Sequence, residues 1–155
     1  MKRYIGVKMV KAEPAHRYWL EDGKTVIVAH DEDKPQIVAK ATACDDGYRV
    51  VYPDGYESWS PKAAFEEAYR ETKCMTFGLA IEAMKKGYRV ARYGWNGKGI
   101  YLELQIPDEH SKMTLPYIYI VTNGLITDNP HAPKGAVPWL ASQTDMLADD
   151  WYVVE

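Results

Sequence analysis

The chain has 155 residues, which suit one average domain or two very small ones, and its 46% hydrophobic and 26% charged residues exclude intrinsic disorder. No apolar run approaches the roughly 20 residues that cross a bilayer, and no secretory segment follows Met1, so we expect a cytosolic protein. The formal charge is -3, and basic and acidic residues are balanced in both halves, which argues against DNA or RNA as a partner.

The first half of the sequence predicts a small β-rich unit. Apolar runs favour strands at residues 4–10 and 25–29, with a polar stretch at 12–14 between them. Residues 47–52 lead into a turn that contains Pro53, a pattern typical of a β-hairpin. We therefore expect an antiparallel sheet in this part of the chain.

One short helix is expected to close this unit. The returning strand of the hairpin should end at Trp59, because Ser60 is a favoured N-cap residue and Pro61 suits the first helical position. The apolar face of this helix would consist of Ala64, Phe65, Ala68 and Tyr69. The helix would complete a first domain of residues 1–74.

A second domain, residues 75–155, is predicted to follow a junction at residues 71–74. Thr76 can cap a helix that Gly87 would stop. Beyond it we expect strands at residues 88–92, 100–106, 117–121 and 151–154, a short apolar continuation at 125–126, and a loop at 128–133. The predicted fold class is α+β: a small antiparallel sheet packed with short helices, preceded by a mostly β N-terminal unit with one helix.

Few residues suggest catalysis or metal binding. The four histidines fall in predicted loops or strand edges, without an evident partner for acid–base work. Cys44 and Cys74 have no His or Cys beside them at metal-ligand spacing and are expected to be free thiols. Residues 94–99 are glycine-rich but lack the setting and the ending of a phosphate-binding loop. We therefore predict no catalytic residue, no metal and no cofactor.

The stretch from Arg92 to Gly99 contains more than a turn requires. Trp95 beside Asn96 and Arg92 can stack on a base and hydrogen-bond its edge, while the cation meets a phosphate. The alternative is that Trp95 packs over its own sheet. The residues alone leave both interpretations open.

A second stretch, residues 137–151, begins a short helix after Trp139. Ser142 is the predicted N-cap, and Asp145 three positions later forms a variant of the capping box. The free backbone N–H groups of such a helix start suit an anion such as phosphate. The alternative is that Ser142 and Asp145 only cap each other.

Short motifs throughout the second half resemble one small phage domain. In chain order they are Phe77-Gly78-Leu79-Ala80, Val90-Ala91-Arg92, Trp95-Asn96-Gly97-Lys98-Gly99, Pro116-Tyr117-Ile118, Val137-Pro138-Trp139, Ser142-Gln143-Thr144-Asp145-Met146-Leu147-Ala148 and Asp150-Trp151. They cover nearly all of residues 75–155, which are similar to the second class of Thoeris anti-defence proteins.

This resemblance implies a phage protein that acts in the cytoplasm of the infected bacterial host. Members of the family are sponges: they bind cyclic ADP-ribose derivatives made by bacterial TIR-domain enzymes, such as glycocyclic ADP-ribose, without cleaving them. The resemblance also implies a homo-oligomer, typically a tetramer. The resemblance further implies that some members bind the cyclic dinucleotides or trinucleotides of CBASS at a separate site.

The resemblance assigns ligand-binding roles to ten residues. Trp95 and Trp139 are expected to stack on adenine, and Arg92 to meet a phosphate. Phe77 and Tyr101 would line the pocket. Ribose hydroxyls or phosphate oxygens would be bound by Asn96, Ser142, Gln143, Thr144 and Asp145.

The N-terminal part departs from the simple family pattern. It resembles another small phage module, on the motifs Tyr4-Ile5-Gly6, Ala12-Glu13-Pro14, Tyr52-Pro53-Asp54-Gly55-Tyr56, Ser58-Trp59-Ser60-Pro61 and Phe65-Glu66-Glu67-Ala68-Tyr69. This resemblance implies no particular activity.

Two other functions compete with a sponge. In a nucleotide-degrading enzyme, Asp145, Asp149 and Asp150 would have to act with a metal. In a phage structural or protein-interaction module, the Trp residues would be interface anchors.

Overall fold

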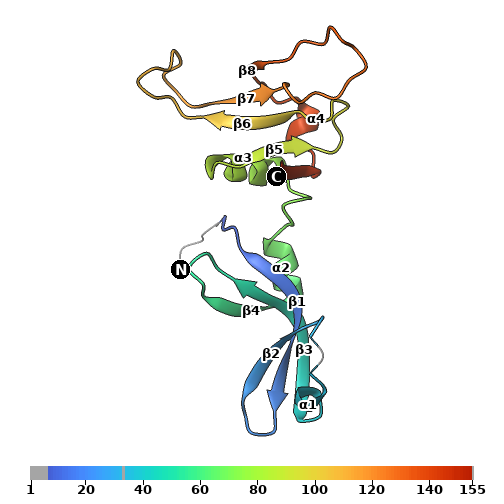
Figure 1. The fold of residues 1–155 in the computed structure, drawn as a ribbon. Helices are drawn as coiled ribbons and strands as arrows, with labels where there is room; N and C mark the ends of the chain where they lie inside the picture. Colours follow the sequence, from blue (N-terminus) through green and yellow to red (C-terminus); the bar gives the residue numbers. More distant parts are fainter. Residues whose placement is uncertain (1–6, 33, 155) are drawn as a thin grey trace. The chain divides into compact units, whose positions relative to one another are not determined.

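The computed structural model describes residues 7–32 and 34–154, and it divides the chain into two compact units, Met1–Tyr69 and Arg70–Glu155 (Figure 1). Each unit contains one antiparallel sheet and short helices, so the predicted α+β fold is confirmed. Across the described ranges, no helix has the length and apolar character that a bilayer span requires.

The first unit is built on a four-stranded sheet with the order β2-β1-β3-β4. Its elements are β1 (Lys11–Leu20), β2 (Thr25–Ala29), α1 (Pro35–Val38), β3 (Ala41–Val51), β4 (Glu57–Pro61) and α2 (Lys62–Ala68). The β3–β4 hairpin forms as predicted, because Gly55 adopts the left-handed φ of +84° that its turn needs. The buried apolar residues of this sheet include Ala15, Val28, Ala29 and Val50.

The first strand begins later than predicted. Residues 7–10 form no strand, and residues 4–6 lie outside the described part of the chain. Strand β1 instead runs through the stretch at 12–14, which we expected to be a connection. Most side chains of β1 are exposed or half-buried, so polar residues are compatible with it, and the Pro14 carbonyl accepts a hydrogen bond from His30 N–H at 3.0 Å.

The predicted start of the following helix is wrong by one residue. Ser60 remains in β4, where it pairs with Tyr48, and Pro61 is the N-cap residue without a side-chain cap. Only part of the predicted apolar face is covered. Phe65 and Tyr69 are half-buried and their rings stack with centroids 4.8 Å apart, whereas the two alanines of that face are exposed.

The second unit is built on a five-stranded antiparallel sheet with the order β8-β7-β6-β5-β9. Its elements are α3 (Phe77–Lys85), β5 (Arg89–Arg92), β6 (Tyr101–Gln105), β7 (Tyr117–Val121), β8 (Ala136–Pro138), α4 (Gln143–Met146) and β9 (Trp151–Val154). The strands predicted here form within one residue of their expected bounds. Residues 125–126 do not form a strand; Ile126 N–H instead donates to the Lys98 carbonyl at 2.9 Å in an isolated bridge.

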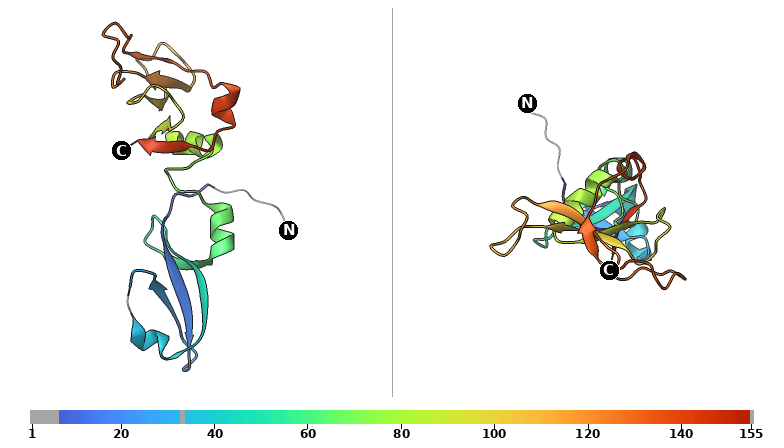
Figure 2. Two further views of the ribbon diagram at one scale, coloured as in Figure 1. Left: turned by 90° about the vertical axis from the view of Figure 1, so that its right-hand side faces the viewer. Right: turned by 90° about the horizontal axis from the view of Figure 1, so that it is seen from above.

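Helix α3 supplies one side of the second core, against β5 and β9 (Figures 1 and 2). It begins as predicted at Thr76, whose side chain accepts a hydrogen bond from Leu79 N–H, and it ends before Gly87, where φ is +87°. The buried cluster that it joins consists of Met75, Ala80, Ala83, Met84, Val90, Leu102 and Trp151. This core fixes β5 and β9, the strands from which the candidate site is built.

Candidate ligand-binding site

The short helix α4 is held by a complete capping box. Ser142 Oγ accepts a hydrogen bond from Asp145 N–H at 3.1 Å, and Asp145 Oδ2 accepts one from Ser142 N–H at 3.1 Å and one from Ser142 Oγ at 2.6 Å. The predicted cap is therefore confirmed. It turns the Asp145 side chain inward, so that this residue is only 9% exposed.

Asp145 also joins α4 to the segment after β5. Its Oδ1 accepts hydrogen bonds from Arg92 Nη1 at 2.8 Å and from Trp95 Nε1 at 2.9 Å. Burial opposes ionisation of this carboxyl, but the bonds from Ser142, Trp95 and Arg92 outweigh it and lower the pKa of Asp145 to about 2. The carboxylate therefore stays ionised and acts as the centre of a hydrogen-bond network.

Asp150 engages the other edge of the same guanidinium. Arg92 Nε donates to Asp150 Oδ1 at 2.7 Å, and Gly94 N–H donates to Asp150 Oδ2 at 2.6 Å. Two of the three guanidinium nitrogens are thus committed to carboxylates, and the Arg92 side chain is 11% exposed. Arg92, Asp145 and Asp150 together carry a net charge of -1. These three side chains alone are therefore a poor receptor for a phosphate.

Four aromatic rings pack beside this network. Trp95 and Trp139 each lie edge-on to the fully buried Trp151, with centroids 5.4 and 6.1 Å away, and Phe77 tilts against it at 5.3 Å. Trp95 and Trp139 are also edge-on to each other at 6.1 Å. Trp95, Trp139 and Phe77 are half-buried against the core, so each ring has a structural role as well as an accessible part.

The remaining predicted residues fall into two groups. Four of them are exposed on the segments that the Asp145 network joins: Asn96, Ser142, Gln143 and Thr144. Tyr101 is placed elsewhere. It precedes the fully buried Leu102 in β6, so its side chain projects from the opposite face of the sheet, where Arg89 lies over its ring at 4.9 Å.

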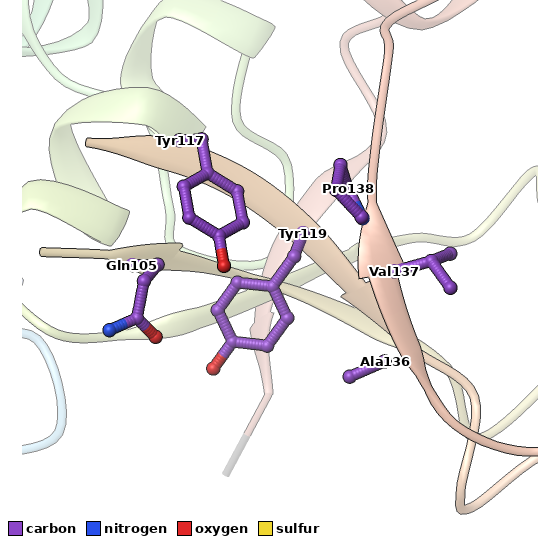
Figure 3. A pocket seen from close by; sticks show the side chains of 6 residues that line it. All are labelled: Gln105, Tyr117, Tyr119, Ala136, Val137 and Pro138. Carbon is purple, nitrogen blue, oxygen red and sulfur yellow. The ribbon is translucent and has the colours of Figure 1, made fainter. Parts of the chain in front are cut away.

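That opposite face carries a pocket that the sequence did not reveal. The pocket has a volume of about 210 Å³ and is lined by Gln105, Tyr117, Tyr119, Ala136, Val137 and Pro138 (Figure 3). Beside it, Glu103 accepts hydrogen bonds from Tyr119 Oη and, at 2.6 Å, from Arg89 Nε. The bond to Glu103 raises the pKa of Tyr119 to about 12. The alternation of polar residues along β6 and β7 was the available signal, since every second side chain of a strand shares a face.

A family model described as the Thoeris anti-defense 2-like domain matches residues 75–154. The chain belongs to this family. A relative named Thoeris anti-defense 2, from Bacillus phage SP01, is 38% identical over 84 residues, which are 52% of this chain and 94% of the relative. The resemblance found in the sequence is confirmed, and the chain is a phage anti-defence protein. The family match begins at residue 75, after the first unit.

Proposed function

We propose that the second unit binds a signalling nucleotide of the cyclic ADP-ribose type, such as glycocyclic ADP-ribose, and sequesters it without cleaving it. Family membership supports the anti-defence role. The observation that carries the binding site is the bonding of Asp145 to both Arg92 and Trp95, because it holds the turn after β5 against the start of α4. Binding groups on two otherwise separate segments are thereby preorganised.

In this proposal the predicted site residues divide by task. Asn96, Ser142, Gln143 and Thr144 contact ribose hydroxyls and phosphate oxygens, because they are the exposed polar members. Trp95, Trp139 and Phe77 offer the accessible parts of their rings to the base. Arg92 and Asp145 act as positioning residues whose charges largely compensate each other.

Lys98 is the better cation for a phosphate. It lies on the same turn as Trp95, is exposed, and its Nζ donates to the Tyr93 carbonyl at 2.7 Å. A neutral carbonyl is a weaker competitor for an ammonium group than two carboxylates are for Arg92. Exchange of that carbonyl for a phosphate oxygen would therefore be favourable.

Sequestration rather than cleavage is supported by the state of the carboxylates. Asp145 and Asp150 already accept hydrogen bonds from Arg92, Trp95 and Gly94, and a carboxylate with a pKa near 2 is a weak general base. Together with the exposed Asp149, they are the three carboxylates that a metal-dependent degrading enzyme would have required, and two of the three are already engaged. Their engagement makes them poor metal ligands and poor bases.

We include cyclic dinucleotides or trinucleotides as a second ligand class, at the pocket of Figure 3. The pocket offers Tyr rings and Gln105 for a base, but its 210 Å³ is below the roughly 300–1,000 Å³ of typical small-molecule sites. It would therefore hold one base of such a ligand. Tyr101, on the same face, belongs to this second site rather than to the Asp145 network.

The test is capture of intact ligand. Purified protein is incubated with cyclic ADP-ribose isomers and with cyclic di- and trinucleotides, filtered, heated and analysed by mass spectrometry for what is released. Unaltered nucleotide in the heated fraction is the expected result. A changed mass would mean an enzyme, and retention of nothing would favour a protein-interaction module.

Variants locate the site. Asn96→Ala and Gln143→Ala should each weaken capture about 10–150-fold, since each removes one or two polar contacts of about 1.5 kcal/mol. Asn123→Ala, another exposed asparagine in a turn of the same unit, is the matched control and should capture normally. Trp95→Ala is less informative, because Trp95 also packs against the core.

A further inference from the structure

Three potential metal ligands from distant parts of the sequence gather on one face of the first sheet. His16 in β1 pairs with Val28 in β2 and with Asp46 in β3, so Asp46 shares its face directly. His30 lies two positions beyond Val28 and therefore returns to that same face. Strand β1, which lies between β2 and β3, thus places His16 near two residues that are distant in sequence. His30 follows it by 14 positions and Asp46 by 30.

The side chains are already close. One ligand atom from each of His16, His30 and Asp46 lies within 4.8 Å of the other two. His30 Nε2 is 3.1 Å from Asp46 Oδ1, and the two imidazole rings stack with centroids 4.2 Å apart. Across residues 7–32 and 34–154, this is the one such group of three.

We propose that His16, His30 and Asp46 form a binding site for a divalent transition-metal ion of the Zn²⁺ type. Two imidazoles and one carboxylate suit Zn²⁺, Ni²⁺ or Cu²⁺, whereas Mg²⁺ and Ca²⁺ prefer sets made of oxygen ligands. Zinc–ligand distances are about 2.0–2.2 Å, so small side-chain rotations must draw the three atoms together. The side chains of His30 and Asp46 are 40% and 44% exposed, which permits that movement and leaves a coordination position for water.

The ammonium group of Lys62 competes with a metal ion for the Asp46 carboxylate. Its Nζ lies 3.6 Å from Asp46 Oδ2, and it follows Pro61, which pairs with Gly47 beside Asp46. An ammonium group repels a divalent cation and occupies one carboxylate oxygen. The Lys62 side chain is 56% exposed and can swing into solvent when an ion binds.

The site is tested by titration of the full chain, without an affinity tag, with Zn²⁺ in an isothermal calorimeter. One ion per chain is expected. The double variant His16→Ala/His30→Ala should lose at least 10-fold in affinity, because even partners one shell beyond the ligands contribute about 10–100-fold. Lys62→Met should bind several-fold more tightly, a gain that damage to the fold would not produce.

His110→Ala is the matched control, because His110 is an 85% exposed histidine that lies outside the group. It should bind Zn²⁺ as the unchanged protein does. Imidazole NMR signals of the unchanged protein provide a test that needs no variant: Zn²⁺ should shift His16 and His30 and leave His110 in place. Equal affinity in the double variant, or uniform shifts of all histidines, would overturn the proposal. Neither result bears on nucleotide binding by the second unit.

Discussion

Asp145 links several segments of the second unit around the proposed site. It accepts hydrogen bonds from Ser142, Trp95 and Arg92, and its own carbonyl accepts one from Trp151 Nε1 at 3.0 Å. Its side chain is 12% exposed. Donors from the N-cap of α4, from the end of β5 and from the turn after it therefore converge on one carboxylate, while β9 bonds to the backbone carbonyl of the same residue.

We predict that Asp145→Asn lowers the free energy of unfolding at pH 7 by about 2 kcal/mol, measured by urea denaturation. The folded-state pKa of about 2 lies below the ordinary value of 3.8, and a tenfold change in proton affinity corresponds to about 1.4 kcal/mol. Because the folded pKa is depressed, this stability is fully present above pH 4 and is lost as the pH falls towards 2. The difference between the two proteins should therefore shrink over that window.

Asp149→Asn is the control, since Asp149 is exposed beside the same network. It should change the free energy of unfolding by no more than about 0.5 kcal/mol. A difference between wild type and Asp145→Asn that stayed constant from pH 6 to pH 2 would show that the network does not depend on the charge.

At the scale of elements, the glycine-rich turn of residues 94–99 packs directly against the turn after β7. Gly99 has a φ of +78°, and a Cβ atom there would collide with the carbonyl oxygen of Gly124. The adjacent bridge between Lys98 and Ile126 continues the contact. This close approach of two backbones fixes the turn that carries Trp95 and Asn96.

We predict that Gly99→Ala destabilises the protein by about 1–3 kcal/mol more than Gly87→Ala does, because overpacking against fixed atoms typically costs this much. Both residues have positive φ, which alone costs an alanine about 1–2 kcal/mol. Gly87 has open space where a Cβ would lie, whereas Gly99 meets backbone that cannot move aside cheaply. Urea denaturation measures the free energy of unfolding of both variants. Equal losses of stability would mean that the turns at Gly99 and Gly124 can move apart without cost.

Elements with local signals were predictable from the sequence. The caps at Thr76 and Ser142 gave the starts of α3 and α4, and apolar runs gave β7 and β9. Strand β1 was missed because its partners on both sides, rather than its own composition, make it a strand.

Most of the residues that meet around Asp145 could be named from the sequence, but their arrangement could not, and Asp150 was missed. Asp150 lies 58 positions from Arg92, and no spacing rule links them before β5 and β9 are known to pair. The position of Tyr101 on the opposite face likewise follows from the burial of Leu102. The same limit hid the group of His16 and its partners, which depends on the registers of two strand pairs.

At the scale of the whole molecule, the second unit holds its own core. All members of its buried cluster, from Met75 to Trp151, lie within Arg70–Glu155. We predict that residues 70–155 alone unfold in a single cooperative transition and capture nucleotide as the full chain does, by calorimetry and filtration. A fragment of residues 1–69 is the control and should capture none. Binding by the full chain alone would give the first unit a part in the site.

The last prediction concerns assembly, which we expect to complete the site. Two leucines beside α4 are strongly exposed: Leu140 at 91% and Leu147 at 82%. Burial of each against a second copy would contribute about 1.5–3 kcal/mol, so apolar contact here favours a homo-oligomer, which the family pattern leads us to expect to be a tetramer. They flank Ser142 and Gln143, so the same contact would bring a second chain to the proposed ligand.

Leu140→Lys/Leu147→Lys should therefore raise the dissociation constant of the oligomer by about 10²–10⁴-fold and abolish nucleotide capture with it. Light scattering at several concentrations measures the mass, and filtration measures capture. Leu115→Lys, at a leucine that is 75% exposed in the loop between β6 and β7, is the matched control and should leave both unchanged. If the double variant became monomeric and still held nucleotide tightly, one chain would be sufficient for the site, and the exposed leucines would serve assembly alone.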